Sequence, residues 1–114
     1  MADLPNGSGE DEYEVIYSKS VLSFMLDTIT SKRVYEKVDS YRHLLAAFPE
    51  LGTPYQPEYA AARCPFPCRC IPVPDTPFTI YYGIDDEHRT IEVFYMEHQN
   101  ANPHERFSWE CLSF

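Results

Sequence analysis

Apolar positions in the second quarter of the chain recur with the period of an α-helix. They follow one another at steps of three and four residues, as Val34, Val38, Tyr41, Leu45 and Phe48. The opposite positions are charged or polar and include Lys32, Arg33, Lys37 and Arg42. This pattern predicts an amphipathic helix of about four turns. Pro49 and Gly52 end the pattern, as expected after a helix C-terminus.

A shorter helix is predicted just before this one. Ser18 and Ser20 are suitable N-caps, and the next apolar residues fall on one helical face, at Leu22, Met25, Leu26 and Ile29. Thr30 and Ser31 then break the first helix and cap the second. Because so few residues join the two helices, we expect a helical hairpin.

Alternating apolar and polar positions predict four strands. The first covers residues 13–17, the second 68–73, the third 78–84 and the fourth 90–98. In the third strand one face carries Phe78, Ile80, Tyr82 and Ile84. In the fourth, a strict alternation sets Ile91, Val93 and Tyr95 against Glu92, Phe94 and Met96. Pro72 favours an edge or a bulge, and residues 52–67 read as a loop.

The order of these elements predicts an α+β fold. Short connections make the last three strands an antiparallel meander, and the helical hairpin is expected to pack on one face of the sheet. The opposite face is expected to be partly open to solvent or to a partner. We expect one domain over residues 12–114, preceded by a flexible acidic tail over residues 1–11.

Composition and charge narrow the classes of function. The 114 residues are 44% hydrophobic and carry a net charge of -9. More than half of that charge belongs to Asp3, Glu10, Asp11, Glu12 and Glu14. A general nucleic-acid coat is excluded because it needs clustered Lys and Arg, although a local basic site is not. No stretch reaches the roughly 20 apolar residues of a membrane helix, and no secretory signal begins the chain. We therefore expect a cytoplasmic protein.

Three of the four cysteines form the spacing CxxxCxC, at Cys64, Cys68 and Cys70, and Cys111 lies far from them. Zinc sites usually show two well-separated CxxC-like pairs, so this spacing favours reduced, buried thiols over a metal site. A disulfide framework is not expected in the cytosol. On one strand, Cys68 and Cys70 would face the same side. The sequence contains no nucleotide, metal or flavin motif, so no cofactor is expected.

Five segments, in this order and spacing, resemble the RelE/ParE toxin superfamily of bacterial type II toxin–antitoxin systems. The segments are residues 13–18, 48–52, 69–73, 78–86 and 91–98. The resemblance implies a toxin that a cognate antitoxin wraps and inactivates. RelE-branch toxins cleave messenger RNA in the ribosomal A site, which would make this chain a metal-independent endoribonuclease. ParE-branch toxins instead inhibit DNA gyrase by binding it. A toxin fold kept as a detoxified binding partner is the third alternative.

RNA cleavage needs a general base, a general acid and cations that stabilise the transition-state charge. The resemblance suggests Arg69 and His98 as catalytic residues, and Arg63, His104 and Arg106 as substrate-binding residues. Histidine suits acid–base work because it titrates near neutral pH. A minimal site would bring the first two residues within about 10 Å on the open sheet face.

Each candidate also has a purely structural interpretation. Arg69 would pair with Glu92 across the sheet, His98 would bond the loop at 99–103, and the later residues would sit in a solvated turn. The chain departs from the RelE branch in two ways. It has only nine Lys and Arg residues, four of them on the second predicted helix, and it lacks a C-terminal catalytic tyrosine.

Overall fold

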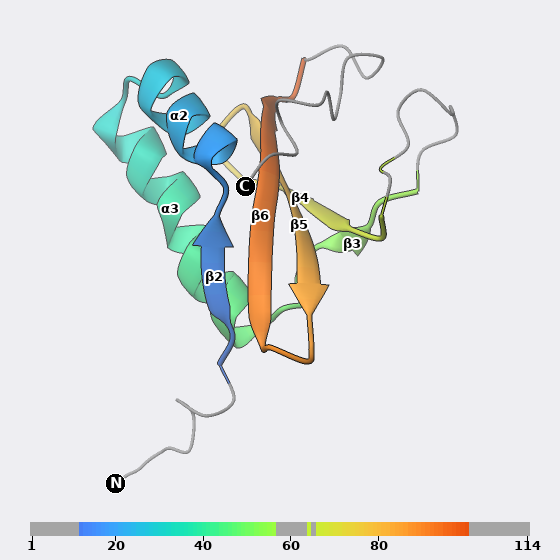
Figure 1. The fold of residues 1–114 in the computed structure, drawn as a ribbon. Coiled ribbons are helices and arrows are strands. Elements are labelled where there is room, and N and C mark those ends of the chain that lie inside the picture. The colour runs from blue at the N-terminus through green and yellow to red at the C-terminus, as the bar shows by residue number, and fades with distance from the viewer. Residues whose placement is uncertain (1–11, 57–63, 65, 101–114) are drawn as a thin grey trace, which may run out of the picture.

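The order of elements along the chain is the predicted one, with one strand added (Figure 1). The computed structural model describes residues 12–56, 64 and 66–100. Its elements are β2 (Glu14–Tyr17), α2 (Lys19–Thr28), α3 (Lys32–Ala47), β3 (Thr53–Pro54), β4 (Arg69–Pro72), β5 (Phe78–Asp85) and β6 (Thr90–His98). The predicted α+β fold is confirmed. The predicted N-terminal tail, residues 1–11, lies outside the described residues.

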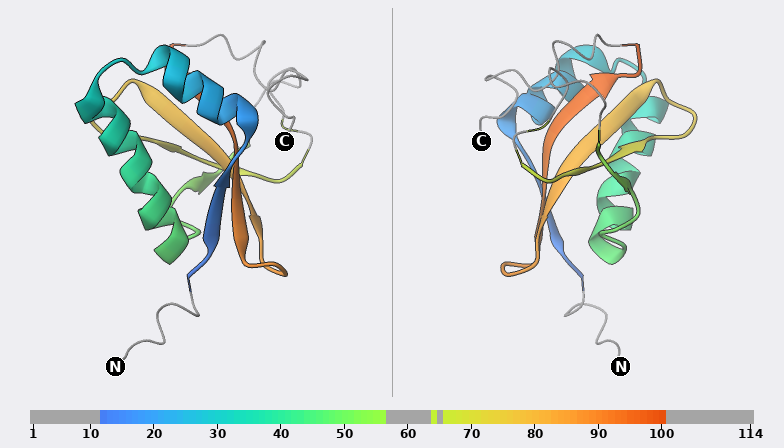
Figure 2. Two further views of the ribbon diagram at one scale, coloured as in Figure 1. Left: turned by 60° about the vertical axis from the view of Figure 1, so that its left-hand side comes forward. Right: turned by 90° about the vertical axis from the view of Figure 1, so that its right-hand side faces the viewer.

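The strands form one five-stranded sheet in the order β2-β6-β5-β4-β3. The last three long strands make the predicted antiparallel meander. The first strand, β2, returns to lie parallel to β6. Both helices cover the same side of the sheet, as the two views of Figure 2 show. We call this side the helix face and the opposite side the far face.

Serine side chains start both helices, as predicted. The Ser18 hydroxyl accepts a hydrogen bond from the backbone N–H of Val21 at 3.2 Å, and the Ser31 hydroxyl accepts one from Val34 at 3.3 Å. Such caps satisfy N–H groups that have no partner within the helix. In α3 the predicted apolar face is confirmed up to Leu45, which is buried.

Half of the predicted inner face of α2 is wrong. Met25 and Ile29 are buried as predicted, whereas Leu22 and Leu26 are exposed and Val21 is buried instead. The cause is the attachment of α2 to the sheet. Ser18 is the only residue between β2 and α2, and its backbone N–H donates to the carbonyl of Val93 in β6. This bond fixes the rotation of the helix, so the position just before each exposed leucine faces inward.

The core on the helix face unites both helices with β5 and β6. Its buried members are Val21, Met25, Ile29, Val38, Leu45, Val73, Phe78, Ile80, Tyr82, Ile91, Val93 and Met96. The strict alternation predicted for the last strand is wrong after Val93, because Met96 joins this core. A bulge causes the change, since Tyr81 pairs with Tyr95 but Tyr82 pairs with Val93. Phe94 is thus the extra residue on its strand.

The far face is more closed than the sequence indicates. Tyr81, Phe94 and Cys68 are buried there and form a second, smaller cluster. The chain between α3 and β4, predicted as a loop, contributes the missed strand β3 and the Tyr55 side chain that packs on this cluster. We refer to these residues as the far-face cluster.

Candidate functional site

Arg69 is held by the fold on the helix face. It lies directly opposite Tyr82 in the β4–β5 pairing, so both side chains share the side of the sheet that faces the core. Its Nε donates a hydrogen bond to the carbonyl of Gly52 at 3.1 Å. The structure therefore gives Arg69 a structural partner, although this partner is a carbonyl and not the predicted Glu92.

Tyr82 belongs to the same hydrogen-bond network. Its hydroxyl donates to the Pro49 carbonyl at 2.7 Å and accepts from the Gly52 N–H at 2.9 Å. Burial raises the pKa of this phenol, so it stays protonated and keeps its donor. Together Arg69 and Tyr82 fasten the turn that follows α3 to the sheet.

His98 ends β6, as predicted, and its imidazole is exposed. The ring packs edge-on against Phe78 at 5.8 Å between centroids, and Nδ1 accepts the backbone N–H of Asn100 at 3.1 Å. This is close to the structural alternative, in which the histidine orders the loop after the strand. The free side of the ring lines a small hollow with Ser20 and Phe24 of α2.

The structure does not bring Arg69 and His98 together. Arg69 is opposite Tyr82, and His98 is opposite Phe78. These two partners are four residues apart along β5, which is about 13 Å of strand. Neither side chain lies on the far face. The other three predicted residues, Arg63, His104 and Arg106, lie outside the described residues.

The basic residues of α3 form a solvated face. Lys32 lies 3.8 Å from Glu36, and both side chains are largely exposed. Arg42 pairs with Asp39 at 3.2 Å and lies 5.9 Å above the Tyr17 ring. Because each of these cations already has a partner on the same helix, the pattern fits surface ion pairs.

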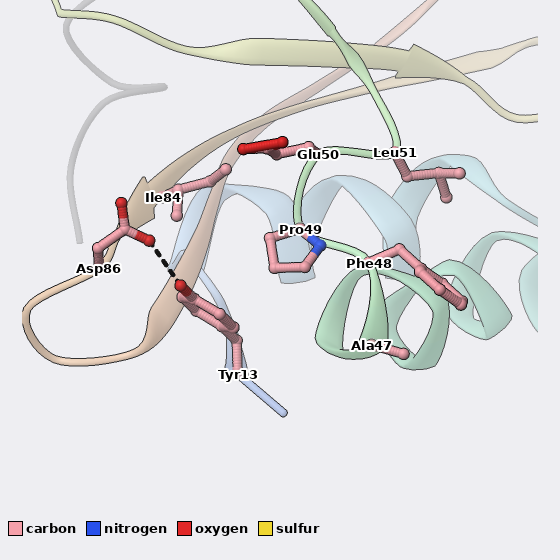
Figure 3. A pocket seen from close by; sticks show the side chains of 8 residues that line it. All are labelled: Tyr13, Ala47, Phe48, Pro49, Glu50, Leu51, Ile84 and Asp86. Atoms are coloured by element: carbon pink, nitrogen blue, oxygen red, sulfur yellow. Dashed lines mark hydrogen bonds between the residues drawn. The ribbon is translucent and has the colours of Figure 1, made fainter. Parts of the chain in front are cut away.

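A hollow lies at the C-terminal end of α3 (Figure 3). Its volume is about 660 Å³. It is bordered by the start of β2, the turn after α3 and the end of β5, through Tyr13, Ala47, Phe48, Pro49, Glu50, Leu51, Ile84 and Asp86. We call it the α3-end groove. Phe48, predicted as a core residue, is 60% exposed here, and Leu51 is 41% exposed.

The rim of the α3-end groove is acidic. The Tyr13 hydroxyl donates to the Asp86 carboxylate at 2.5 Å, and this bond raises the pKa of Tyr13. Glu50 lies across the groove and is exposed. The guanidinium of Arg89 sits 4.7 Å above the Tyr13 ring, which fixes one wall. Apolar side chains with carboxylates beside them suit a partner that offers apolar and basic groups.

Comparisons with known proteins place this geometry in a known fold. No protein-family model and no curated protein sequence matches the chain. Solved structures do match. A chain of the toxin–antitoxin complex RelBE2 from Mycobacterium tuberculosis superposes with a TM-score of 0.58 at 20% identity, covering 76% of this chain and 98% of that one. A mutant of the E. coli toxin RelE in the free state superposes with a TM-score of 0.59 at 14% identity, covering 87% and 96%.

The chain has a RelE-like toxin fold. This confirms the fold that the resemblance implies. At these identities the likeness concerns the fold alone, so the activity must be argued from the residues. Within this RelE-like fold, the described residues form the α3-end groove, and the sheet register keeps Arg69 and His98 apart.

No metal site is found in the described part of this fold. Among residues 12–56, 64 and 66–100, no three His, Cys, Asp or Glu side chains are grouped closely enough to hold a metal ion. In the same ranges, neither helix is long and apolar enough to cross a bilayer.

The sequence reasoning missed the α3-end groove. A signal was present, because Phe48 and Leu51 flank the proline that ends α3. Their spacing extends the helical stripe beyond the helix. Apolar residues that follow the end of an amphipathic helix can stay exposed, and such exposed residues can mark a contact surface.

Proposed function

We propose that this protein is the toxin component of a type II toxin–antitoxin system and is held inactive by a cognate antitoxin. The fold supports this, since one solved structure reported above is the toxin–antitoxin complex RelBE2 and the other is the toxin RelE. Two functions remain to be weighed for the free toxin, inhibition of a protein target and cleavage of RNA.

Inhibition by protein binding is the function that the geometry supports best. The observation that carries it is the α3-end groove, where Phe48 and Leu51 stand exposed beside carboxylates. Exposed aromatic and aliphatic side chains in a concave surface are typical anchors of protein interfaces. A ParE-like toxin that binds DNA gyrase would use such a surface without any catalytic group.

RNA cleavage on the ribosome is the second candidate, and His98 is the observation that favours it. Its imidazole is exposed at the end of β6, and His104 and Arg106 follow within a few residues of sequence. Against it stands Arg69, which is engaged with Gly52 about 13 Å along the sheet from His98. In a metal-independent cleavage, the histidine would then need Arg63 or Arg106 as its cationic partner.

Induced expression in a bacterial host separates these functions. The wild type is compared with Phe48→Asp, His98→Ala and the matched control Leu26→Asp, whose leucine is 74% exposed on α2. We expect growth arrest that Phe48→Asp abolishes and the other two variants keep, with no new transcript 5′ ends. The purified protein should then inhibit supercoiling by gyrase, with Phe48→Asp inactive.

The alternatives give different results in the same experiment. New 5′ ends inside translated codons, lost in His98→Ala but kept in Phe48→Asp, would replace the protein-binding mechanism by ribosome-dependent cleavage of mRNA. Circular dichroism of each purified variant shows whether it is folded. Folded wild type that causes no arrest would leave the detoxified binding partner as the function.

A further inference from the structure

Two thiols meet at the edge of the far face. Cys68 is buried in the far-face cluster, and Cys64 is half-buried and packs against that cluster. Burial and the neighbouring Cys64 side chain both raise the pKa of the Cys68 thiol. Neither takes part in a disulfide, and neither belongs to the α3-end groove. The contact between them therefore has no role in the function proposed above.

The neighbouring chain holds this pair in place. The backbone N–H of Tyr55 donates to the Cys68 carbonyl at 3.0 Å, which ties the end of β3 to the start of β4. Phe66, between the two cysteines in sequence, packs its ring against Phe94 at 4.8 Å between centroids. These contacts hold Cys68 and the neighbour of Cys64 beside the far-face cluster.

Cys70 is a poor third partner, although it lies on the same face. It stands two residues beyond Cys68 along an extended chain, where side chains two positions apart point the same way, so the two Cβ atoms are about 6.6 Å apart. A disulfide prefers Cβ atoms much closer, at about 3.8 Å. Pairing Cys68 with Cys70 would therefore distort β4, whose backbone at Cys70 is paired with both Thr53 and Tyr81.

We propose that Cys64 and Cys68 are a redox-sensitive pair that forms a reversible intramolecular disulfide when the protein meets a peroxide. The Cys64 sulfur attacks one oxygen of the peroxide and breaks the O–O bond, which gives a sulfenic acid, and the thiol proton leaves with the other oxygen as water. The Cys68 sulfur then attacks the sulfenic sulfur. Its proton leaves with the hydroxyl as a second water, so two thiols and one peroxide give one disulfide and two waters.

The environment of each thiol assigns these roles. Burial raises the pKa of Cys68, so its thiol stays protonated and is a poor first nucleophile. Cys64 is the more exposed of the two and reaches a soluble oxidant first. In a cytosolic protein such a disulfide would be transient, as redox-responsive disulfides usually are.

Peptide mapping of the full chain tests this pair directly. The reduced protein is treated with limiting hydrogen peroxide, blocked with N-ethylmaleimide and digested with trypsin without reductant. Cleavage after Arg63 and Arg69 releases residues 64–69 with both cysteines, and places Cys70 in the next peptide. We expect peptide 64–69 to lose the mass of two hydrogen atoms and take up no maleimide. Dithiothreitol should restore two reactive thiols.

Two variants make the result decisive. Cys64→Ser, at the half-buried position, should abolish the lighter peptide, whereas the matched control Cys70→Ser should keep it. Circular dichroism confirms that both variants are folded. A disulfide that joins peptides 64–69 and 70–89, a disulfide between two chains, or over-oxidised thiols without any disulfide would each overturn the proposal.

Discussion

The two faces of the sheet are packed in different ways. The helix face is covered by two regular helices whose side chains interlock with those of β5 and β6. Among the described residues, the far face is covered by Tyr55, Cys64 and Phe66, which belong to no helix. Both faces bury aromatic residues completely, Tyr82 on one and Phe94 on the other. The described side chains outside the helices are therefore enough to bury an aromatic ring on the far face.

This difference affects how each face can respond to change. Helical side chains project from a backbone that is held by regular hydrogen bonds, so a cavity among them closes only in part. A side chain outside the helices, such as Phe66, can move more easily into a cavity. We therefore expect the helix face to be rigid and the far face to adapt, and this agrees with the redox-sensitive pair proposed for the far face.

The largest effects are expected from replacing one large buried side chain on each face with alanine. Ile80→Ala, on the helix face, should lower the free energy of unfolding by about 4 kcal/mol because the lost volume leaves a cavity. Phe94→Ala removes more atoms on the far face, yet we expect only about 3 kcal/mol. The half-exposed ring of Phe66, 4.8 Å away, can fill part of the space. Urea denaturation of both variants measures the difference.

An exposed leucine provides the baseline for these two variants. Leu26→Ala on α2 should change the free energy of unfolding by less than about 0.5 kcal/mol. A cost for Phe94→Ala near this baseline would show that the far-face cluster is not a core. A cost well above that of Ile80→Ala would show that the far face cannot adapt.

The parts of the helix face that α3 and β5 supply could be predicted from the sequence. The period of α3 fixes Val38 and Leu45, and the alternation in β5 fixes Ile80 and Tyr82, because these patterns repeat along one element. The rotation of α2 could not be predicted, since it depends on the long-range bond between Ser18 and Val93. The change at Met96 was equally hidden, because a bulge has no periodic signal.

Two glycines, one for each face, give a smaller and sharper contrast. A Cβ at Gly52 would lie 2.7 Å from the Cys70 carbonyl and 2.9 Å from the Tyr82 hydroxyl. A Cβ at Gly83 would meet only the Pro67 carbonyl, at 3.9 Å. We expect Gly52→Ala to cost about 2 kcal/mol through overpacking. Gly83→Ala should be neutral or stabilising by up to about 1 kcal/mol. Thermal denaturation distinguishes these outcomes.

Equal costs for the two glycine variants would mean that strand conformation, and not close packing, decides both. A harmless Gly52→Ala would show that the turn after α3 can move away from the sheet. The hydrogen-bond network formed by Arg69 and Tyr82 would then hold the turn less firmly than its bonds indicate.

The candidate site was harder to predict than the fold. Residue type and place in the resemblance point to Arg69 and His98. His98 ends β6 as predicted, whereas Arg69, predicted to lie within its strand, is the first residue of β4. Their distance from each other depends on register, which is set by partners far away in sequence. The side of the sheet occupied by Arg69 likewise follows from its pairing with Tyr82, which no local pattern contains.

The last predicted effect is a loss of folding stability at alkaline pH, to which ionisable groups on both faces contribute. Burial raises the pKa of Cys68 on the far face above the ordinary 9.0, and the pKa of Tyr17 and Tyr82 on the helix face above the ordinary 10.0. Above each ordinary value the unfolded chain releases a proton that the folded chain keeps, so stability falls as pH rises. The contribution is fully present below that value.

The far face should therefore begin to lose stability about one pH unit before the helix face does. Urea denaturation between pH 8 and pH 11 follows both losses. Cys68→Ala should remove the part that begins near pH 9, and Tyr17→Phe should reduce only the part above pH 10. A wild-type decline that neither substitution alters would mean that other groups govern it. If both substitutions reduced the loss of stability equally and over the same pH range, the two faces would unfold as one unit through the sheet that they share.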